Sequence, residues 1–571
     1  MQRFWRLLKP DTAEIRNIYA YAVFAGLVSL SLPLGIQAIV NLIQGGQIST
    51  SWIILVSLVV AGMAFTSVLQ ILQIRIAENI QQKIFARASF EFAYRIPRIR
   101  MEDLYRHYAP ELVNRFFDTM NVQKGLAKIL IDFSSAALSV AFGLILLSLY
   151  HPFFIAFSVI LLVLVAGIFY MTGRNGLRTS LDESTMKYRV AFWLEELART
   201  STTFKLVGNT QLPLSRTDRH VGDYLESREG HFQVLIRQYS LMVIFKVVVA
   251  AGLLVLGGIL VMQQRMNIGQ FVAAELIILK VMDSVEKLVL SMETIYDVLT
   301  GLEKIGQVTD LELEQETGVD LIQECATDGL DVELDKVTFR YPGQTTPVLD
   351  QLSLNIEAGE KVMLTGNSGS GKSTLLHIIG GLYEISEGSI VYHGLPKGNL
   401  DRASLREVIG DAFAQEQLFH GTVLENIAVG RRNATFENVR KAVKNLELES
   451  FIKSLPQGYE TIIDPSGKKL PQTVVNKLLL ARSIAAPPKM LLLEDAFEHF
   501  DNGERQRIID YITSPERPWT LVAVSADKYL AARCDRIAVL QKGKVVETGT
   551  YRQLSKGIDS KNGRVKVSVD A

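Results

Sequence analysis

Two long stretches of this chain contain no charged side chain. Residues 17–74 and 133–173 hold no Asp, Glu, Lys or Arg. An α-helix needs about 20 predominantly apolar residues to cross the hydrocarbon core of a bilayer, so each stretch has room for two crossings. The alternative, a pair of helices buried in a water-soluble core, rarely runs this far without a charge. The stretches therefore predict helices that span a membrane and contact its lipid.

A third pair of apolar segments follows, which makes six expected spans. Short breaks divide the three pairs at residues 45–47, 151–152 and 263–267. In chain order the expected spans are residues 19–42, 52–72, 133–150, 153–171, 239–262 and 268–290. The long segments after the second and fourth spans keep helical spacing, so we expect the membrane helices to continue beyond the bilayer. Short turns are expected at their tips, near residues 98–103 and 208–214.

Basic residues are distributed unevenly between the two sides of this predicted membrane domain. The two long segments and the first residues of the chain carry many Lys and Arg residues, whereas the three opposite loops hold only Arg265. Because cytoplasmic loops are the ones enriched in Lys and Arg, we expect both termini to be cytoplasmic. The chain is thus expected to be an integral, multi-pass protein of the plasma membrane, or of the inner membrane in a bacterium. Its net charge of zero gives no indication of nucleic-acid binding.

A phosphate-binding sequence lies in the second half of the chain, where the composition changes to that of a soluble α/β domain. Residues 366–373 read Gly-Asn-Ser-Gly-Ser-Gly-Lys-Ser and match the P-loop pattern G-x-x-x-x-G-K-[ST] at each fixed position. An expected buried strand, 360–365, precedes this loop, and an expected helix, 373–380, follows it. The alternative is a plain glycine-rich turn, but the junction of a strand with a helix N-terminus is where a phosphate is favoured.

The residues of this loop are the candidate nucleotide ligands. Backbone N–H groups can converge on the phosphates, Lys372 adds a positive charge, and the Ser373 hydroxyl can hold Mg²⁺. The candidate set is Gly366, Asn367, Ser368, Gly369, Ser370, Gly371, Lys372, Ser373 and Thr374.

Six spans followed by a P-loop domain resemble a half-transporter of the ABC exporter family, and the resemblance covers nearly the whole chain. Three further segments carry it. Phe-Arg-Tyr-Pro at 339–342 is similar to the family's A-loop, Gly-Thr-Val-Leu-Glu-Asn-Ile at 421–427 to the segment after its Q-loop, and Met-Leu-Leu-Leu-Glu-Asp at 490–495 to its Walker B strand. The resemblance implies ATP and Mg²⁺ as cofactors, with Tyr341 stacked on adenine. Residues 32–41 loosely resemble the type I secretion and peptide-export branch.

The fold that this resemblance implies is multi-domain. A six-helix transmembrane exporter domain with cytoplasmic helix extensions occupies residues 1–315, an α/β P-loop nucleotide-binding domain (the ATP-binding cassette) occupies 316–555, and a polar tail occupies 556–571. The family further implies that two half-transporters, as a homodimer or a heterodimer, sandwich two ATP molecules. A periplasmic adaptor protein is a further candidate partner.

The Walker B segment departs from the family. Its usual final pair is Asp-Glu, where Asp orders Mg²⁺ through water and Glu polarises the attacking water, but here the order is Glu494-Asp495. The resemblance therefore assigns Mg²⁺ to Glu494 and makes Glu494 and Asp495 the catalytic candidates. Asp495 is one methylene shorter than the usual Glu, and a misplacement of about 1 Å can cost about 10²-fold in rate.

Three other family positions also differ. The signature, usually L-S-G-G-Q, aligns with Leu-Pro-Gln-Thr-Val at 470–474, and the H-loop histidine aligns with Ala526. The Q-loop glutamine aligns by count with Ala414, and Gln415, one place later, is the candidate to replace it as a nucleotide ligand. A positioned general base contributes roughly 10²–10⁴-fold to rate. The substitutions therefore predict that ATP binding survives better than hydrolysis, in a homodimer and in a heterodimer alike.

Two functions from different classes remain open. The first is an ATP-binding ABC transporter subunit that exports an unidentified substrate with weakened ATP hydrolysis, and the six-span architecture favours it. The second is a non-transporting membrane scaffold or regulator that responds to ATP, and the altered catalytic positions favour it.

Charged residues inside predicted spans are functional candidates because they are costly in a membrane. Lys246 in the fifth span and Asp283 in the sixth lie at similar expected depth. In the simpler interpretation, Lys246 reaches toward the cytoplasm and Asp283 lies beyond the apolar core. In the other, the two side chains contact each other and line the substrate path.

Overall fold

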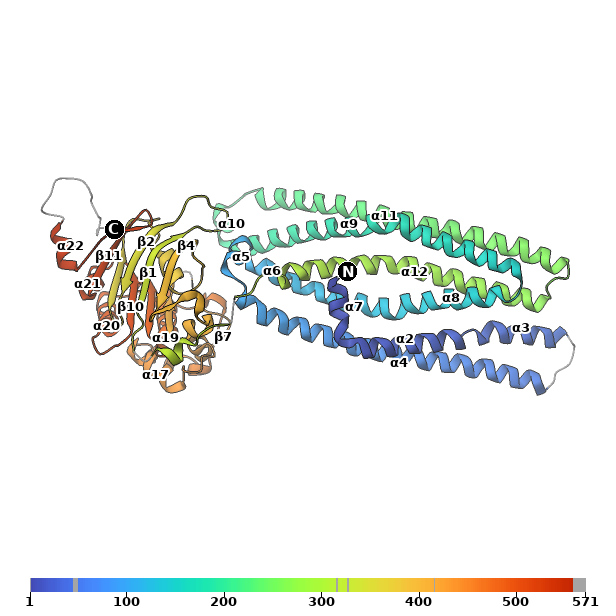
Figure 1. Cartoon of the computed structure of the whole chain (residues 1–571), viewed down its shortest axis with the longest axis horizontal. Helices are drawn as coiled ribbons and strands as arrows, with labels where there is room; N and C mark the ends of the chain where they lie inside the picture. The colour runs from blue at the N-terminus through green and yellow to red at the C-terminus, as the bar shows by residue number, and fades with distance from the viewer. Residues whose placement is uncertain (1, 45–49, 315–316, 326–327, 415, 558–571) are drawn as a thin grey trace. The chain divides into compact units, whose positions relative to one another are not determined.

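The computed structural model describes residues 2–44, 50–314, 317–325, 328–414 and 416–557, and its elements fall into two compact units (Figure 1). The helical unit comprises Met1–Pro97 and His107–Leu311, and the P-loop unit comprises Arg98–Arg106 and Glu312–Ala571. The short segment Arg98–Arg106 therefore belongs with the P-loop unit, although helical-unit sequence flanks it on both sides. The predicted polar tail lies outside the described residues from residue 558 onward.

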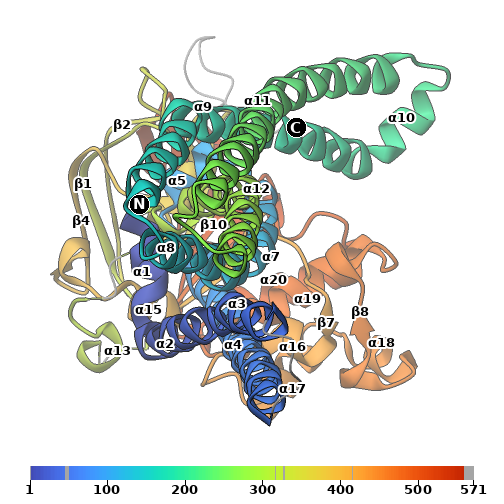
Figure 2. The ribbon, with the colours of Figure 1, turned by 90° about the vertical axis from the view of Figure 1, so that its right-hand side faces the viewer.

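Long α-helices that lie side by side form the helical unit (Figure 2). Its helices are α1 (Gln2–Leu8), α2 (Thr12–Val28), α3 (Ser31–Gln44), α4 (Thr50–Arg95), α6 (Ala109–Asn114), α7 (Asp118–Lys128), α8 (Ser134–Ser148), α9 (Pro152–Arg199), α10 (Ser201–Val207), α11 (Leu212–Met262) and α12 (Ile268–Thr309). A π-helical turn joins α7 to α8. Helices α4, α9 and α11 have 46, 48 and 51 residues. At about 1.5 Å per residue, each is much longer than a bilayer core is thick, as the continued helical spacing predicts.

Five helical segments among the described residues are long and apolar enough to cross a membrane. They are Arg3–Gln44, Thr50–Arg98, Ala109–Ser148, Pro152–Arg199 and Leu212–Met262. The predicted sixth span is part of the continuous helix α12, but Glu275, Lys280 and Asp283 make it less apolar than the others. Helix α12 packs against α3, α7, α8, α9 and α11, and it lies among α7, α8 and α11 in Figure 2. Glu275 and Lys280 are half-buried against these neighbours and so lie partly away from lipid, whereas Asp283 is exposed.

Two of the three predicted breaks between spans can be compared with helix ends. Helix α8 ends at Ser148 and α9 begins at Pro152, where the His151 side chain accepts a hydrogen bond from the Phe153 N–H at 3.2 Å. Helix α12 begins after Asn267, which forms a reciprocal capping box with Gln270. The predicted break at residues 45–47 lies outside the described residues.

The P-loop unit is built on a mostly parallel six-stranded sheet and a four-stranded antiparallel sheet. The larger sheet has the order β12 (Lys544–Gly549), β11 (Arg536–Gln541), β3 (Lys361–Thr365), β10 (Thr520–Val524), β9 (Met490–Glu494), β6 (Ile409–Ala412). The smaller sheet has the order β2 (Leu349–Ile356), β1 (Val332–Phe339), β4 (Glu387–Tyr392), β5 (Leu395–Pro396), and β7 (Gly421–Thr422) pairs with β8 (Ile462–Ile463). The helices are α13 (Leu321–Glu324), α14 (Lys372–Ile379), α15 (Arg402–Glu407), α16 (Val423–Ala428), α17 (Phe436–Asn445), α18 (Glu449–Ser454), α19 (Gln472–Ala485), α20 (Asn502–Thr513), α21 (Lys528–Arg533) and α22 (Tyr551–Gly557).

The register of three parallel strands brings distant sequence segments to one edge of the large sheet. Val524 of β10 pairs with Leu364 of β3 on one side and with Glu494 of β9 on the other. All the residues of β9 and β10 are buried, as expected for central parallel strands covered on both faces. The loop after β3 and the carboxylates at the end of β9 therefore leave the sheet beside each other, where ligands bind in open α/β sheets.

One short helix of the P-loop unit, α5 (Met101–Arg106), comes from the first long segment between spans. The sequence predicts only a turn there. Glu102 Oε1 accepts a hydrogen bond from the Glu384 N–H at 2.8 Å, and Met101 packs against the apolar core beside the P-loop. A β-bridge between Ile99 and Leu313 fixes the start of this segment. Helix α5 is thus docked on the domain that carries the P-loop.

An ion pair joins α11 and α12 inside the predicted spans. Lys246 Nζ donates a hydrogen bond to Glu286 Oε2 and lies 3.9 Å from Asp283 Oδ1. The Asp283 side chain is 73% exposed, whereas those of Lys246 and Glu286 are each 28% exposed. The contact between Lys246 and Asp283 is therefore present, but Glu286, which the sequence analysis does not single out, is the closer and better enclosed partner. A role of this pair in the substrate path stays a prediction.

Exchanging the two charges tests whether this pair stabilises the helical unit. We expect K246E and E286K each to lower stability by roughly 1–3 kcal/mol, between the limits for exposed and buried pairs, because each places like charges together. The double variant K246E/E286K restores an ion pair and should recover most of the loss. The measurement is the thermal unfolding midpoint of the purified full-length chain in lipid nanodiscs. If the double variant lost as much stability as the two single variants together, this result would contradict the pairing.

Candidate functional site

The backbone of the P-loop adopts conformations that favour glycine. Gly366, Gly369 and Gly371 have φ angles of +143°, +76° and +101°, in a region that side chains with a Cβ rarely adopt. A Cβ on Gly366 would also lie 2.1 Å from the carbonyl oxygen of Leu540. The matched sequence pattern therefore corresponds to a loop whose shape requires these glycines.

Lys372 and the start of α14 make this loop suitable for phosphate. The Lys372 ammonium donates hydrogen bonds to the carbonyl oxygens of Gly366 at 2.8 Å and Asn367 at 2.9 Å, so the side chain folds back over the loop. The N-cap of α14 is Gly371, which has no side chain to cap the helix, so the first N–H groups of α14 are available to an anion. Burial lowers the pKa of Lys372, while Asp495 and Glu494 act in the opposite direction. The loop, Lys372 and the start of α14 thus have the form of an anion cradle, and the binding of nucleotide by the predicted ligands stays a prediction.

The two hydroxyl residues that follow Lys372 are placed differently. Ser373 is exposed at the first turn of α14, where its hydroxyl could hold a Mg²⁺ ion bound with the nucleotide. Thr374 is buried, and its hydroxyl forms a 3.0 Å hydrogen bond with the hydroxyl of Tyr341. The structure therefore connects the predicted adenine-stacking tyrosine directly to the phosphate-binding helix, and Thr374 serves to position Tyr341.

The Walker B carboxylates lie at the same edge of the sheet. Glu494 is the last residue of β9, is 8% exposed, and accepts a hydrogen bond from the Ala414 N–H at 3.4 Å. Asp495 follows with a left-handed φ of +46°. Burial, together with the nearby carboxylates of Glu498 and Glu494, raises the pKa of Asp495. The predicted catalytic pair is thus beside the P-loop, with Glu494 turned partly toward a backbone donor.

The remaining predicted positions offer little polar chemistry. Gln415 lies outside the described residues. Ala526 is exposed two residues after β10 and presents only a methyl group at the expected histidine position. At the signature position, Pro471 is the N-cap of α19 and supplies no side-chain hydrogen bond, while Thr473 is half-buried in the first turn.

Two titratable residues near this site lie outside the motifs that sequence reasoning used. Burial and the neighbouring Asp411 raise the pKa of Glu416 to about 8. His377 Nδ1 is buried with no hydrogen-bond partner among the described residues, and burial lowers the pKa of its ring. Family spacing gave no signal for either residue, because both owe their properties to the fold around them.

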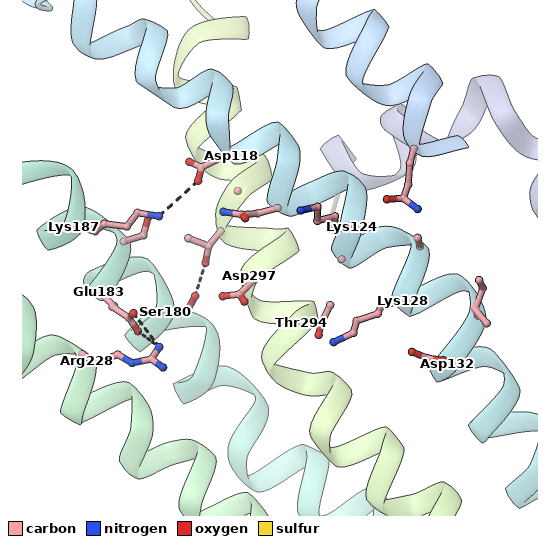
Figure 3. A pocket seen from close by; sticks show the side chains of 18 of the residues that line it. Asp118, Lys124, Lys128, Asp132, Ser180, Glu183, Lys187, Arg228, Thr294 and Asp297 are labelled. Atoms are coloured by element: carbon pink, nitrogen blue, oxygen red, sulfur yellow. Dashed lines mark hydrogen bonds and ion pairs between the residues drawn. The ribbon is translucent and has the colours of Figure 1, made fainter. Parts of the chain in front are cut away.

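A separate polar cavity of about 760 Å³ lies in the helical unit. Helices α4, α7, α9, α11 and α12 contribute its lining, and acidic and basic side chains point into it (Figure 3). Glu183 and Arg228 form an ion pair at 3.1 Å, and Lys187 lies 3.8 Å from Asp118. These two pairs fix α9 to α11 and α7 around the cavity.

Other charges in this cavity have no such partner. Among the described residues, Lys124, Lys128, Asp132 and Asp297 line it without an ion pair within 4.0 Å. Enclosure by the helices, and then the nearby Glu293 and Glu183, raise the pKa of Asp297 to about 6. The cavity therefore offers both positive and negative groups to a ligand, which suits a hydrophilic molecule better than an apolar one.

The raised pKa of Asp297 predicts a pH-dependent stability. The folded chain holds this proton more tightly than the unfolded chain, whose carboxyl titrates near 3.8. The stabilisation is complete below the unfolded pKa and is lost as pH rises through about 6. D297N cannot ionise at this position and so does not lose this stabilisation. We therefore expect the difference in unfolding midpoint, D297N minus wild type, to increase as the pH is raised from about 4.5 to 7.5. T294V, an uncharged lining change, is the control, and a constant D297N difference would contradict the prediction.

Comparisons with known proteins agree with this geometry. Residues 349–498 match the family model described as ABC transporter. The chain is 35% identical over 223 residues to a multidrug export ATP-binding/permease protein of Staphylococcus aureus, which covers 39% of each protein. It is 30% identical over 338 residues to the cyclolysin secretion/processing ATP-binding protein CyaB of Bordetella pertussis, which covers 59% of this chain and 47% of that protein. The matched parts span less than half the length of either relative.

A solved structure extends the likeness to both units. The structure of a bacterial Atm1-family ABC exporter with ATP bound is similar with a TM-score of 0.81, 18% sequence identity and coverage of 96% of both chains. At this identity the likeness shows the fold, and it confirms the predicted fold class of a helical transmembrane domain plus an α/β P-loop domain. Residues 349–498 are therefore similar to the ABC transporter family, and the chain has, over nearly its whole length, the fold of an ABC exporter chain.

Proposed function

We propose that this chain is an exporter subunit that binds ATP with Mg²⁺ firmly and hydrolyses it slowly. The observation that carries the proposal is the contrast within one site between a complete P-loop cradle and an altered set of catalytic positions. Different residues of the chain support the firm binding of ATP and its slow hydrolysis.

Firm binding of ATP depends on groups that are all present in this chain. The glycine backbone, Lys372 and the uncapped start of α14 together provide the donors and the positive charge that a triphosphate needs. Bound Mg²⁺ would neutralise phosphate charge, and Ser373 and Glu494 are the residues placed to hold it. Tyr341, held by Thr374, provides an aromatic face for adenine.

The chain lacks several groups that rapid hydrolysis of ATP needs. Asp495 is one methylene shorter than the usual Glu, so its carboxylate reaches less far toward an attacking water. Ala526 cannot contact a γ-phosphate, and Pro471 has no N–H to donate. Losing one donor to developing negative charge typically costs about 10²–10³-fold in rate. These losses leave binding, which uses backbone groups and Lys372, largely intact.

Export is the activity that the architecture favours. The relatives are named for multidrug export and for cyclolysin secretion, and this chain has the exporter fold. We infer that it works with a second half-transporter, as a homodimer or heterodimer, in a plasma or inner membrane with both termini cytoplasmic. A periplasmic adaptor remains a candidate partner. The mixed charges of the polar cavity favour a hydrophilic substrate.

A non-transporting, ATP-responsive scaffold is the second candidate. The Glu494-Asp495 order and Ala526 are the observations that favour it, because a regulator needs ATP to bind and close a dimer but not to turn over. The two candidates therefore share their predicted nucleotide chemistry and differ in substrate movement.

Restoring the family residues tests the proposed nucleotide chemistry. The purified full-length chain in nanodiscs should retain labelled ATP, and K372A should weaken retention at least about tenfold because a charge-assisted contact is lost. The variant P471S/Q472G/T473G/E494D/D495E/A526H should release phosphate about 10²–10⁴-fold faster than wild type. The measurements are filter binding and phosphate release.

Two outcomes would contradict the proposal. One is a wild-type chain that retains no ATP, and the other is wild-type hydrolysis as fast as that of the restored variant. Movement of substrate into inverted vesicles that depends on Lys372 would select the exporter, whereas ATP binding without any movement, even with partner half-transporters present, would select the scaffold.

A further inference from the structure

A second tyrosine covers one face of Tyr341. Tyr105 of α5, in the same unit, stacks on it with ring centroids 4.9 Å apart and planes inclined by 19°. This is a favourable aromatic separation. A base inserted between the rings would need about 3.5–4.0 Å of contact distance on each side, so the two tyrosines cannot sandwich one as they stand.

Two aromatic side chains of the domain core also contact Tyr341. Phe339 and Tyr383 approach its ring nearly edge-on, with centroids 4.9 Å and 5.4 Å away. They are 2% and 7% exposed, whereas Tyr105 is 47% exposed. Of these three rings Tyr105 is the exposed one, so a base that approaches Tyr341 from solvent would meet Tyr105.

Tyr105 is placed there by a docked helix. Met101 packs against the apolar core, and the Glu102 carboxylate accepts the Glu384 N–H, so the first turn of α5 is fixed. Tyr105 lies one turn further on, at the exposed end of the helix. The stack thus combines a fixed Tyr341, held by Thr374, with a tyrosine at the freer end of α5.

We propose that Tyr105 competes with the base of ATP for Tyr341, so that nucleotide binds by displacing Tyr105. The inference rests on the proposed ATP binding and adds a residue to that site from a segment far away in sequence. Only chains in which Tyr341 is uncovered can stack the base of ATP. The apparent affinity for ATP is therefore the affinity of those chains multiplied by the fraction of chains in that state. The phosphates bind elsewhere in the cradle, so only the contribution of the base is affected.

This competition also favours bases with large stacking surfaces. A purine replaces the Tyr105 contact with one of similar extent, whereas a pyrimidine replaces it with less. Displacement has a mechanical consequence as well, because α5 is joined by the chain to α4 on one side and to α6 on the other. Tyr105 is accordingly a positioning and specificity residue that senses whether a base is present.

Equilibrium binding to the full-length chain in nanodiscs tests this competition. We expect Y105A to bind ATP about two- to tenfold more tightly than wild type, which corresponds to the usual strength of an aromatic pair. Y105F keeps the ring and should remain close to wild type, and Y105W, with a larger ring, should bind ATP more weakly. Inorganic tripolyphosphate, which has no base, should bind equally to all four chains.

The control variant is R106A, which changes the exposed neighbouring residue of α5 and should leave ATP affinity unchanged. In the Y341A background, Y105A should lose its effect, because the two rings act through one contact. Weaker or unchanged ATP binding by Y105A, with tripolyphosphate binding intact, would overturn this inference while leaving ATP binding itself established. A wild-type chain that binds neither ATP nor tripolyphosphate would instead overturn the proposed function.

Discussion

The parallel register of β3, β10 and β9 is the constraint on which the nucleotide site depends. Leu364, Val524 and Glu494 lie at one level, so the P-loop and the Walker B carboxylates leave the sheet side by side. A one-residue slip of β9 would move the carboxylates by about 3.3 Å and turn them to the other face of the sheet. The complete burial of β9 and β10 therefore maintains the site as well as the fold.

Under the proposed function, the same edge of the sheet would support binding and catalysis to different degrees, because the two need different precision. A triphosphate is held by backbone N–H groups and by a flexible lysine, which tolerate small shifts of the ligand. Polarising a water molecule requires one carboxylate at one distance, and the Glu494-Asp495 order shortens the side chain at the second position by one methylene. A chain can therefore keep its cradle while losing its turnover.

The sequence predicted those features that depend on local chemistry. The length of the apolar segments predicted the long helices, and residues 151–152 and 263–267 predicted two breaks between them. The glycine pattern predicted the P-loop, which lies between β3 and α14. It did not predict the docking of α5, the stacking of Tyr105 on Tyr341 or the Glu286 partner of Lys246. Each of these contacts joins residues from distant segments, and its geometry is set by how whole elements pack rather than by spacing along the chain.

The polar cavity of the helical unit imposes a physical condition on whatever enters it. An apolar ligand would remove water from Lys124, Lys128, Asp132 and Asp297 without replacing its hydrogen bonds, which is costly for charged groups. A ligand with both positive and negative groups could replace that water, and it could do so without breaking the Glu183–Arg228 pair that joins α9 to α11. The charges in this cavity would thus disfavour a lipid-like ligand through the cost of desolvation.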